Sequence, residues 1–214
     1  NNPLTPIQLS AERIQKRFKG SSEEKDFIDT STKTIIAQVD VLRDLVSAFS
    51  NFAEREKLSF TSSDINNLIS ESIRLFSRQY ENISIQLEKG NLELVELDRN
   101  KIQQVLNNLL LNAIDACEEA ENPKINFETK IKKINSINYC EVTIKDNGPG
   151  FDENIIKNAF EPYQTSKKHG KGLGLAIVKS IIDEHKGEIT ISNNDIGASI
   201  KIFLPTKQIQ GDIE

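Results

Sequence analysis

"IKDNGPGF", residues 144–151, places a carboxylate where the preceding pattern predicts an apolar side chain. Residues 140–145 alternate between apolar and polar, which is typical of a strand with one buried face. The same period puts Asp146 on the buried face, at the end of the strand. An ionised carboxylate only accepts hydrogen bonds, so this position suits the exocyclic amine of a purine. Gly148 and Gly150 let the backbone approach a ligand closely, although an ordinary turn would explain this stretch taken alone.

The helix predicted from about Arg99 to Glu121 carries short polar side chains among its leucines. Asn108, Asn112 and Asp115 are spaced by four and three residues, so they share one face of that helix. Asparagine is a weak helix former, and its carboxamide oxygen can bind Mg²⁺, which takes many of its other ligands from water and phosphate. A ligand-binding face is one interpretation, and a merely solvated face is the other.

A glycine-rich stretch opens another predicted helix, at about 173–185. Its glycines are Gly170, Gly172 and Gly174. Free N–H groups at a helix N-terminus bind anions through hydrogen bonds and the helix dipole. The neighbouring lysines make the stretch basic, namely Lys167, Lys168 and Lys171. We expect a phosphate-binding lid, although the glycine spacing matches neither the dinucleotide fingerprint nor the P-loop.

Residues 3–53 predict a helical hairpin. Apolar residues recur at alternating spacings of three and four on both sides of the polar stretch "KGSSEEKD" at 19–26, a pattern typical of supercoiled helices. Two helices alone bury little surface, so we expect this antiparallel hairpin to pair with a second copy as a four-helix bundle. Packing on the rest of its own chain is the alternative.

The bulk composition argues against several classes of protein. A chain of 214 residues with 37% hydrophobic content can form one or two domains, and a net charge of −5 argues against a nucleic-acid partner. No stretch approaches the roughly 20 apolar residues of a membrane span, so no membrane contact is expected. Cys117 and Cys140 lie in apolar patterns and are expected to be buried free thiols, with a disulfide or a metal site as the alternatives.

The region after about residue 57 alternates helices and strands. Ser63 or Asp64 can cap a helix that runs to about Gln79. The remaining predicted strands are 82–89, 92–98, 124–133, 138–145, 188–193 and 198–205. Antiparallel-looking strands mixed with helices predict an α+β fold, a sandwich of one sheet covered by helices on one face.

The order of these features resembles the ATP-binding domain of sensor histidine kinases, a fold shared with gyrase, Hsp90 and the MutL repair proteins. The resemblance includes the asparagine helix, the Asp-x-Gly-x-Gly stretch, "FEPYQTSK" at 160–167 and the glycine lid, and it covers about residues 57–205. It implies two domains, a dimerisation and histidine phosphotransfer hairpin at 1–56 and a catalytic α/β ATP-binding domain at 57–214.

The resemblance also implies roles for single residues. Asn112 would bind Mg²⁺, Asn108 would lie beside the γ-phosphate of ATP, and Asp146 would accept the adenine amine, with Gly148 and Gly150 shaping the purine pocket. Asn108 and Lys167 are the implied catalytic residues. The other implied nucleotide-binding residues are Asp115, Tyr163, Lys167, Gly170, Lys171, Gly172, Leu173, Gly174 and Leu175.

The first region, "NNPLTPIQLSAERI" at 1–14, resembles the end of the phosphoacceptor box of this family and is particularly similar to the NtrY branch of nitrogen-regulation kinases. The acceptor histidine would lie four residues before Asn2, so this chain is not expected to phosphorylate itself. His185 is interpreted as a structural residue at a helix end. Asn2 occupies a position that can assist dephosphorylation of a partner, and a helix N-cap is the alternative.

The implied function is that of an ATP-dependent histidine kinase, which uses Mg²⁺ and ATP to phosphorylate a histidine and then an aspartate of an NtrX-like response regulator. The implied location is cytoplasmic, in a longer protein anchored in the membrane. Two alternatives stay open. One is an ATPase clamp of the gyrase type, in which a glutamate base replaces Asn108, and the other is a dimeric nucleotide-binding scaffold without catalysis.

Overall fold

The computed structural model describes residues 5–18, 21, 24–36, 39, 58–152, 156–162 and 172–207. The chain divides into two compact units, Asn1–Lys57 and Leu58–Glu214. Among the described residues, no helix is both long enough and apolar enough to cross a membrane.

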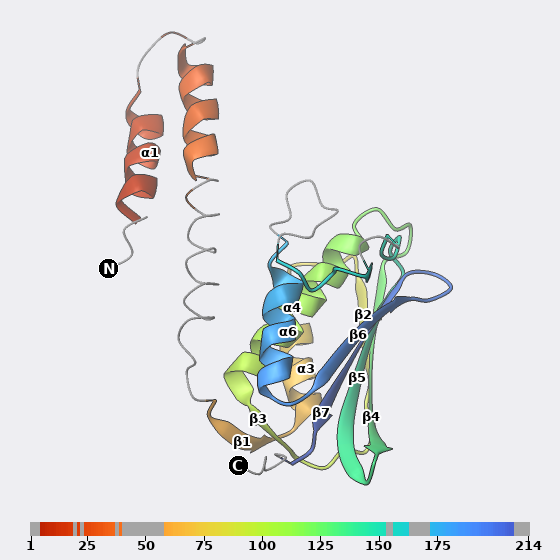
Figure 1. Ribbon diagram of the computed structural model, residues 1–214. Coiled ribbons are helices and arrows are strands. Elements are labelled where there is room, and N and C mark those ends of the chain that lie inside the picture. The colour runs from red at the N-terminus through yellow and green to blue at the C-terminus, as the bar shows by residue number, and fades with distance from the viewer. Residues whose placement is uncertain are drawn as a thin grey trace. The chain divides into compact units, whose positions relative to one another are not determined.

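The N-terminal unit contains two helical segments, α1 (Thr5–Arg17) and a second at 24–36, which lie side by side (Figure 1). A capping pair marks the start of the second segment: Glu24 Oε2 accepts hydrogen bonds from the Ser21 N–H at 2.9 Å and from Ser21 Oγ at 2.8 Å. The predicted hairpin is confirmed over these ranges. The rest of the predicted stretch 3–53 lies outside the described residues.

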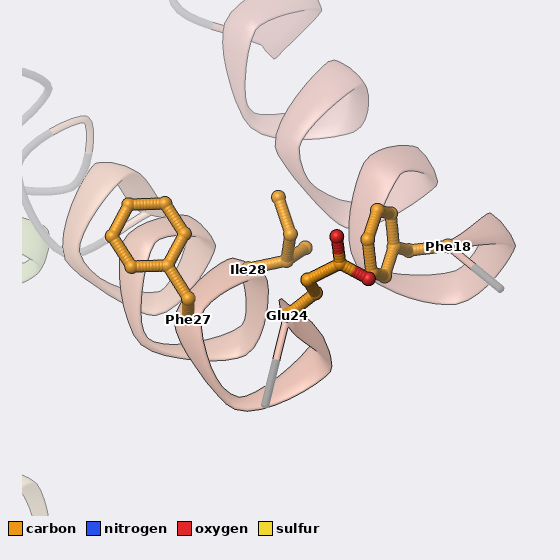
Figure 2. Close-up of a pocket in the computed structure, with 4 residues that line it drawn as sticks. All are labelled: Phe18, Glu24, Phe27 and Ile28. Carbon is orange, nitrogen blue, oxygen red and sulfur yellow. The ribbon is translucent and has the colours of Figure 1, made fainter. Parts of the chain in front are cut away.

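The hairpin leaves much of its apolar surface exposed. Ala11 and Val39 are buried, whereas Ile7 and Ile14, from the same predicted seam, are 47% and 50% exposed. Phe18, Glu24, Phe27 and Ile28 line a pocket where the two helical segments meet (Figure 2). This pocket holds no group that the sequence predicts to bind nucleotide. Pairing of the exposed seam with a second copy stays a prediction.

The C-terminal unit is a five-stranded sheet with order β2-β4-β5-β7-β6, covered on one face by helices α3, α4 and α6 (Figure 1). The strands are β2 (Ser84–Glu88), β4 (Lys124–Ile134), β5 (Ile137–Asp146), β6 (Glu188–Asn193) and β7 (Ala198–Pro205). The helices are α3 (Ile65–Ser77), α4 (Arg99–Ala116) and α6 (Gly174–Glu184). The predicted α+β sandwich is confirmed.

Strand pairing differs from the prediction in two ways. The pairing of β2 with β4 is parallel, so the sheet is mixed. A second, two-stranded sheet joins β1 (Phe60–Ser63) to β3 (Val95–Asp98), whereas only one sheet was predicted. The sequence of β1 hides this strand, because its first three residues are exposed and it shows no apolar alternation.

Helix α4 forms the centre of the core and ends earlier than its periodicity predicts. Its buried residues all belong to the hydrophobic core; they are Ile102, Val105, Leu106, Leu109, Leu110, Ala113 and Ile114. The helix stops at Ala116, five residues before the predicted end at Glu121. The reason is tertiary: the Cys117 side chain is fully buried, and its Sγ lies 3.5 Å from Asn147 Oδ1 in the loop after β5.

Helix α3 begins where the sequence predicts. Asp64 is its N-cap, and Asp64 Oδ1 accepts the N–H groups of Asn66 and Asn67 at 2.8 and 3.3 Å. Ser63, the other candidate cap, is the last residue of β1. Helix α3 therefore starts directly from the small sheet and packs beside α4.

Candidate functional site

Asp146 lies at the end of β5 with its side chain on the helix-covered face, as the alternation predicts. The residue is only 7% exposed. Its Oδ1 accepts two backbone hydrogen bonds, from the Gly148 N–H at 3.0 Å and from the Ala198 N–H at 3.3 Å. The carboxylate is therefore oriented by the backbone of two separate segments, the loop after β5 and the start of β7.

The two glycines after Asp146 are packed closely against other parts of the protein, and their predicted role beside a purine stays a prediction. A Cβ added to Gly148 would lie 2.5 Å from the carbonyl oxygen of Ala116, at the end of α4. Gly150 has φ of +76°, and its added Cβ would lie 2.8 Å from Asn193 Oδ1. The loop that follows Asp146 is thus packed closely between the asparagine-bearing helix and the end of β6.

Three of the four asparagines of α4 lie in two different environments. Asn107 Oδ1 accepts a hydrogen bond from Ser72 Oγ of α3 at 2.8 Å, so this asparagine is part of the α3–α4 interface. Asn108 follows Asn107 and therefore points about 100° away from it around the helix, and Asn112 lies one turn beyond Asn108. Both are half-buried. Asp115 is exposed. The structure therefore separates one structural asparagine from the two that the sequence predicts to bind nucleotide.

Asn112 meets the first residue of α6. Its Nδ2 lies 3.7 Å from the position that a Cβ on Gly174 would take. Leu173 is the N-cap of α6 and makes no side-chain capping hydrogen bond. The first N–H groups of a helix have no partner within the helix and lie at the positive end of its dipole. The predicted face of α4 and the predicted anion-binding end of α6 thus adjoin each other.

The described part of the predicted lid is its last part, from Gly172 to Leu175. Gly172 has φ of +65°, a conformation that favours glycine. Phe160 is half-buried and packs against the core. The other predicted residues lie outside the described part of the chain; they are Asn2, Tyr163, Lys167, Gly170 and Lys171.

The far ends of α4 and α6 are joined by a buried histidine. His185 Nε2 accepts the Asp98 N–H at 3.0 Å, and its Nδ1 lies 2.7 Å from the Ile181 carbonyl oxygen, which suits a neutral ring protonated at Nδ1. Burial lowers the pKa of His185. Asp98 is the N-cap of α4 and also accepts the Ser59 N–H at 2.9 Å. His185 is a structural helix-end residue, as predicted, and it fixes α6 against α4.

The donor set of the site suits a metal bound mainly by phosphate. Among the described residues, no three or more His, Cys, Asp or Glu side chains lie together so that they could hold a metal ion. The carboxamide of Asn112 is neutral, so a Mg²⁺ ion there would take its anionic ligands from a nucleotide. Both cysteines are free and buried, as predicted, and burial raises the pKa of Cys140 to about 12.

The sequence patterns did not indicate a role for two residues whose contacts flank Asp146. Asn193 and Asn194 end β6 and begin the following turn, and both contact segments that flank Asp146. In the sequence they form part of a polar turn between two predicted strands. The only signal for them was a pair of asparagines, which turns commonly contain.

Comparison with known proteins agrees with this geometry. Residues 97–208 match the family described as histidine kinase-, DNA gyrase B-, and HSP90-like ATPase. Over 97% of its length the chain is 34% identical to an NtrY-like sensor histidine kinase of Rickettsia conorii (strain ATCC VR-613 / Malish 7). Over 96% of its length it is 34% identical to the nitrogen regulation protein NtrY of Azorhizobium caulinodans. The chain spans 34% of the length of the first relative and 27% of the length of the second.

Solved structures with similar folds come from histidine kinases. The catalytic domain of histidine kinase ThkA is 34% identical, with a TM-score of 0.62, and the match covers 71% of this chain and 98% of that one. A structure of ThkA in complex with response regulator protein TrrA is 29% identical, with a TM-score of 0.70, and the match covers 98% of this chain and 59% of that one.

Proposed function

We infer that this chain, which belongs to the histidine kinase-, DNA gyrase B- and HSP90-like ATPase family, is the kinase portion of a two-component sensor. Its similarity within that family is to the NtrY-like sensor kinases. Membership of this family implies an ATP site. Within the longer sensor, the C-terminal unit would bind ATP and transfer its γ-phosphoryl group to a histidine, and the phosphoryl group would then pass to an aspartate of a response regulator.

The observation that carries this proposal is that α4 contacts both the loop after Asp146 and the start of α6. One end of α4 packs on the loop after Asp146, through Ala116 and Gly148, and the face one turn back meets the start of α6 at Asn112 and Gly174. The buried Asp146 carboxylate, the proposed acceptor for a purine amine, would lie at one end of the bound nucleotide. The amide groups of α4 and the first N–H groups of α6, which we propose for the phosphates, would lie at the other end.

We assign the purine end to Asp146, whose carboxylate would accept the adenine amine. Its Oδ1 is already held by two backbone N–H groups, so the acceptor is oriented before the nucleotide arrives. Gly148 and Gly150 would form the wall of the purine pocket.

We assign the phosphate end to Asn108, Asn112 and the beginning of α6. Asn112 would bind Mg²⁺ and Asn108 would lie beside the γ-phosphate. When bound, Mg²⁺ supplies charge neutralisation on the phosphate oxygens. The backbone of Gly172, Leu173, Gly174 and Leu175 would bind phosphate oxygens, and exposed Asp115 would lie at the rim.

Residues outside the described part of the chain complete the proposal. Lys167 would balance the charge of the γ-phosphate, and Tyr163, Gly170 and Lys171 would belong to the lid. Catalysis by these residues would consist of orienting the phosphoryl group and neutralising its charge, because the proposed acceptor is a histidine outside this unit. His185 is excluded as the phosphoryl acceptor, since both of its ring nitrogens face backbone groups in the core.

The proposed partners bind the hairpin. The exposed seam of α1, which includes Ile7 and Ile14, would pair with a second copy in a four-helix bundle. The complex of ThkA with TrrA supports a response regulator as the second partner, and the NtrY-like relatives favour one of the NtrX type. Asn2 would assist dephosphorylation of that regulator.

Calorimetry and a transfer assay test the proposal together. The chain should bind ATP more tightly with Mg²⁺ than without it, and should phosphorylate, in trans, a hairpin that carries the family's acceptor histidine. Absence of ATP binding would refute the nucleotide site. Binding without transfer would refute the kinase and favour a scaffold, and rapid release of inorganic phosphate without transfer would favour an ATPase.

A further inference from the structure

Asn193, the last residue of β6, binds the backbone of Phe151 in both directions. The Phe151 N–H donates to Asn193 Oδ1 at 2.7 Å, and Asn193 Nδ2 donates to the Phe151 carbonyl oxygen at 2.8 Å. The side chain thereby pairs with the Phe151 backbone as a neighbouring strand would. Gly150, one residue earlier, lies so close to Asn193 Oδ1 that a Cβ there would be 2.8 Å away. Asn193 therefore fixes the end of the loop that follows Asp146.

Asn194, the next residue, organises the turn between β6 and β7. Its Oδ1 accepts the N–H groups of Ile196 and Gly197, each at 2.9 Å, and its Nδ2 donates to the Ala198 carbonyl oxygen at 3.0 Å. This turn packs directly on the backbone of Asp146, because a Cβ on Gly197 would lie 2.2 Å from the Asp146 carbonyl oxygen. Asn194 therefore fixes the position of Ala198.

The two arrangements converge on one oxygen atom. The loop held by Asn193 contains Gly148, and the turn held by Asn194 leads into Ala198. The N–H groups of Gly148 and Ala198 are the two that bind Asp146 Oδ1, at 3.0 and 3.3 Å. Each asparagine thus controls one of the two donors that orient this carboxylate.

We propose that Asn193 and Asn194 are positioning residues for adenine recognition, which act by holding the two N–H donors of Asp146. This inference rests on the proposed function, because it assumes that Asp146 accepts the adenine amine. Without either asparagine, the carboxylate loses one orienting donor and adopts the binding orientation for a smaller fraction of the time. The affinity for ATP falls in proportion to that population, and the preference for a nucleotide that carries the amine falls with it.

The test compares ATP with inosine triphosphate, which has a carbonyl oxygen in place of the exocyclic amine. Calorimetry of the whole chain gives both dissociation constants, for the unchanged protein and for Asn193→Ala and Asn194→Ala. We expect each substitution to weaken ATP binding about ten-fold, since it removes two or three hydrogen bonds, and to weaken inosine triphosphate binding much less. The preference for ATP should therefore decrease by nearly the same factor.

The ratio of the two affinities distinguishes positioning from a general effect on stability. Asn138→Ala is the matched control, because Asn138 lies at the other end of β5 and its Nδ2 donates to Glu93 at 3.2 Å on the surface. This control should keep both affinities. Thermal unfolding without nucleotide checks each variant, and Asn193→Ser, which retains one hydrogen-bonding group, carries the test if Asn193→Ala does not fold.

Equal weakening of ATP and inosine triphosphate binding would overturn the inference, and so would unchanged affinities in both variants. If the unchanged chain did not bind ATP, the proposed function itself would fail, and this inference with it. Binding by the unchanged chain with an unaltered nucleotide preference in the variants would overturn this inference alone.

Discussion

Replacing Asp146 by asparagine separates the two roles of its carboxylate. Asparagine has the same shape and keeps one oxygen, which can still accept the N–H groups of Gly148 and Ala198. The other oxygen becomes an NH₂ group, which would face the adenine amine with a donor against a donor. Asp146→Ala would be a poorer test, because it also removes both structural hydrogen bonds.

The expected loss follows from the hydrogen bond that disappears. A hydrogen bond to a charged group contributes about 1.5–3 kcal/mol, and leaving two donors opposed adds to the cost. A total of about 2–4 kcal/mol corresponds to ATP binding that is ~30- to 1000-fold weaker. The unfolding temperature without nucleotide should change little, because the backbone hydrogen bonds are retained.

Titration calorimetry measures the affinity, and thermal unfolding measures the stability. Glu141→Gln is the matched control, since Glu141 is also a buried acid of β5, 3% exposed, but pairs with Lys130 Nζ at 3.3 Å on the opposite face of the sheet. That variant should lose stability and keep its ATP affinity. Unchanged ATP affinity in Asp146→Asn would refute the assignment of Asp146 to adenine.

Three further predictions follow from the same contacts. Asn112→Ala should weaken ATP binding about ten-fold or more with Mg²⁺ present and much less in EDTA; equal loss in both calorimetric titrations would contradict its role as a metal ligand. Gly148→Ala should destabilise the fold by about 1–3 kcal/mol in urea denaturation, because the new Cβ would lie 2.5 Å from the Ala116 carbonyl oxygen. His185 should make stability depend on pH. Burial lowers its pKa below the ordinary 6.5, so the unfolded chain binds the proton more readily. The stabilisation is complete above about pH 6.5 and is lost as the pH falls toward the folded pKa; urea denaturation of His185→Gln between pH 5 and 8 should show a weaker slope, and an unchanged slope would contradict this account.

Local patterns predicted those parts of the site that depend on neighbouring residues. A period of two was enough to place Asp146 on the buried face of β5, and the glycines before Leu175 were enough to locate the start of α6. In both cases the decisive residues lie within a few positions of each other. The capping role of Asp64 was likewise visible, because an N-cap acts on the next two or three residues.

Contacts between distant segments were not predictable in this way. Helix α4 stops at Ala116 because residues about 30 positions later, Asn147 and Gly148, pack against its end. Asn193 acts on Phe151, 42 positions away, and nothing near it in the sequence indicates that contact. Strand β1 has no pattern of its own and exists through its pairing with β3.

A crystal structure of the chain with Mg²⁺ and a non-hydrolysable ATP analogue is the most direct test of the central claim. We expect the adenine amine within hydrogen-bond distance of the Asp146 carboxylate, and the phosphates between Asn112 and the first turn of α6. An analogue bound elsewhere, or a pocket at Asp146 filled by the protein's own side chains, would contradict the account.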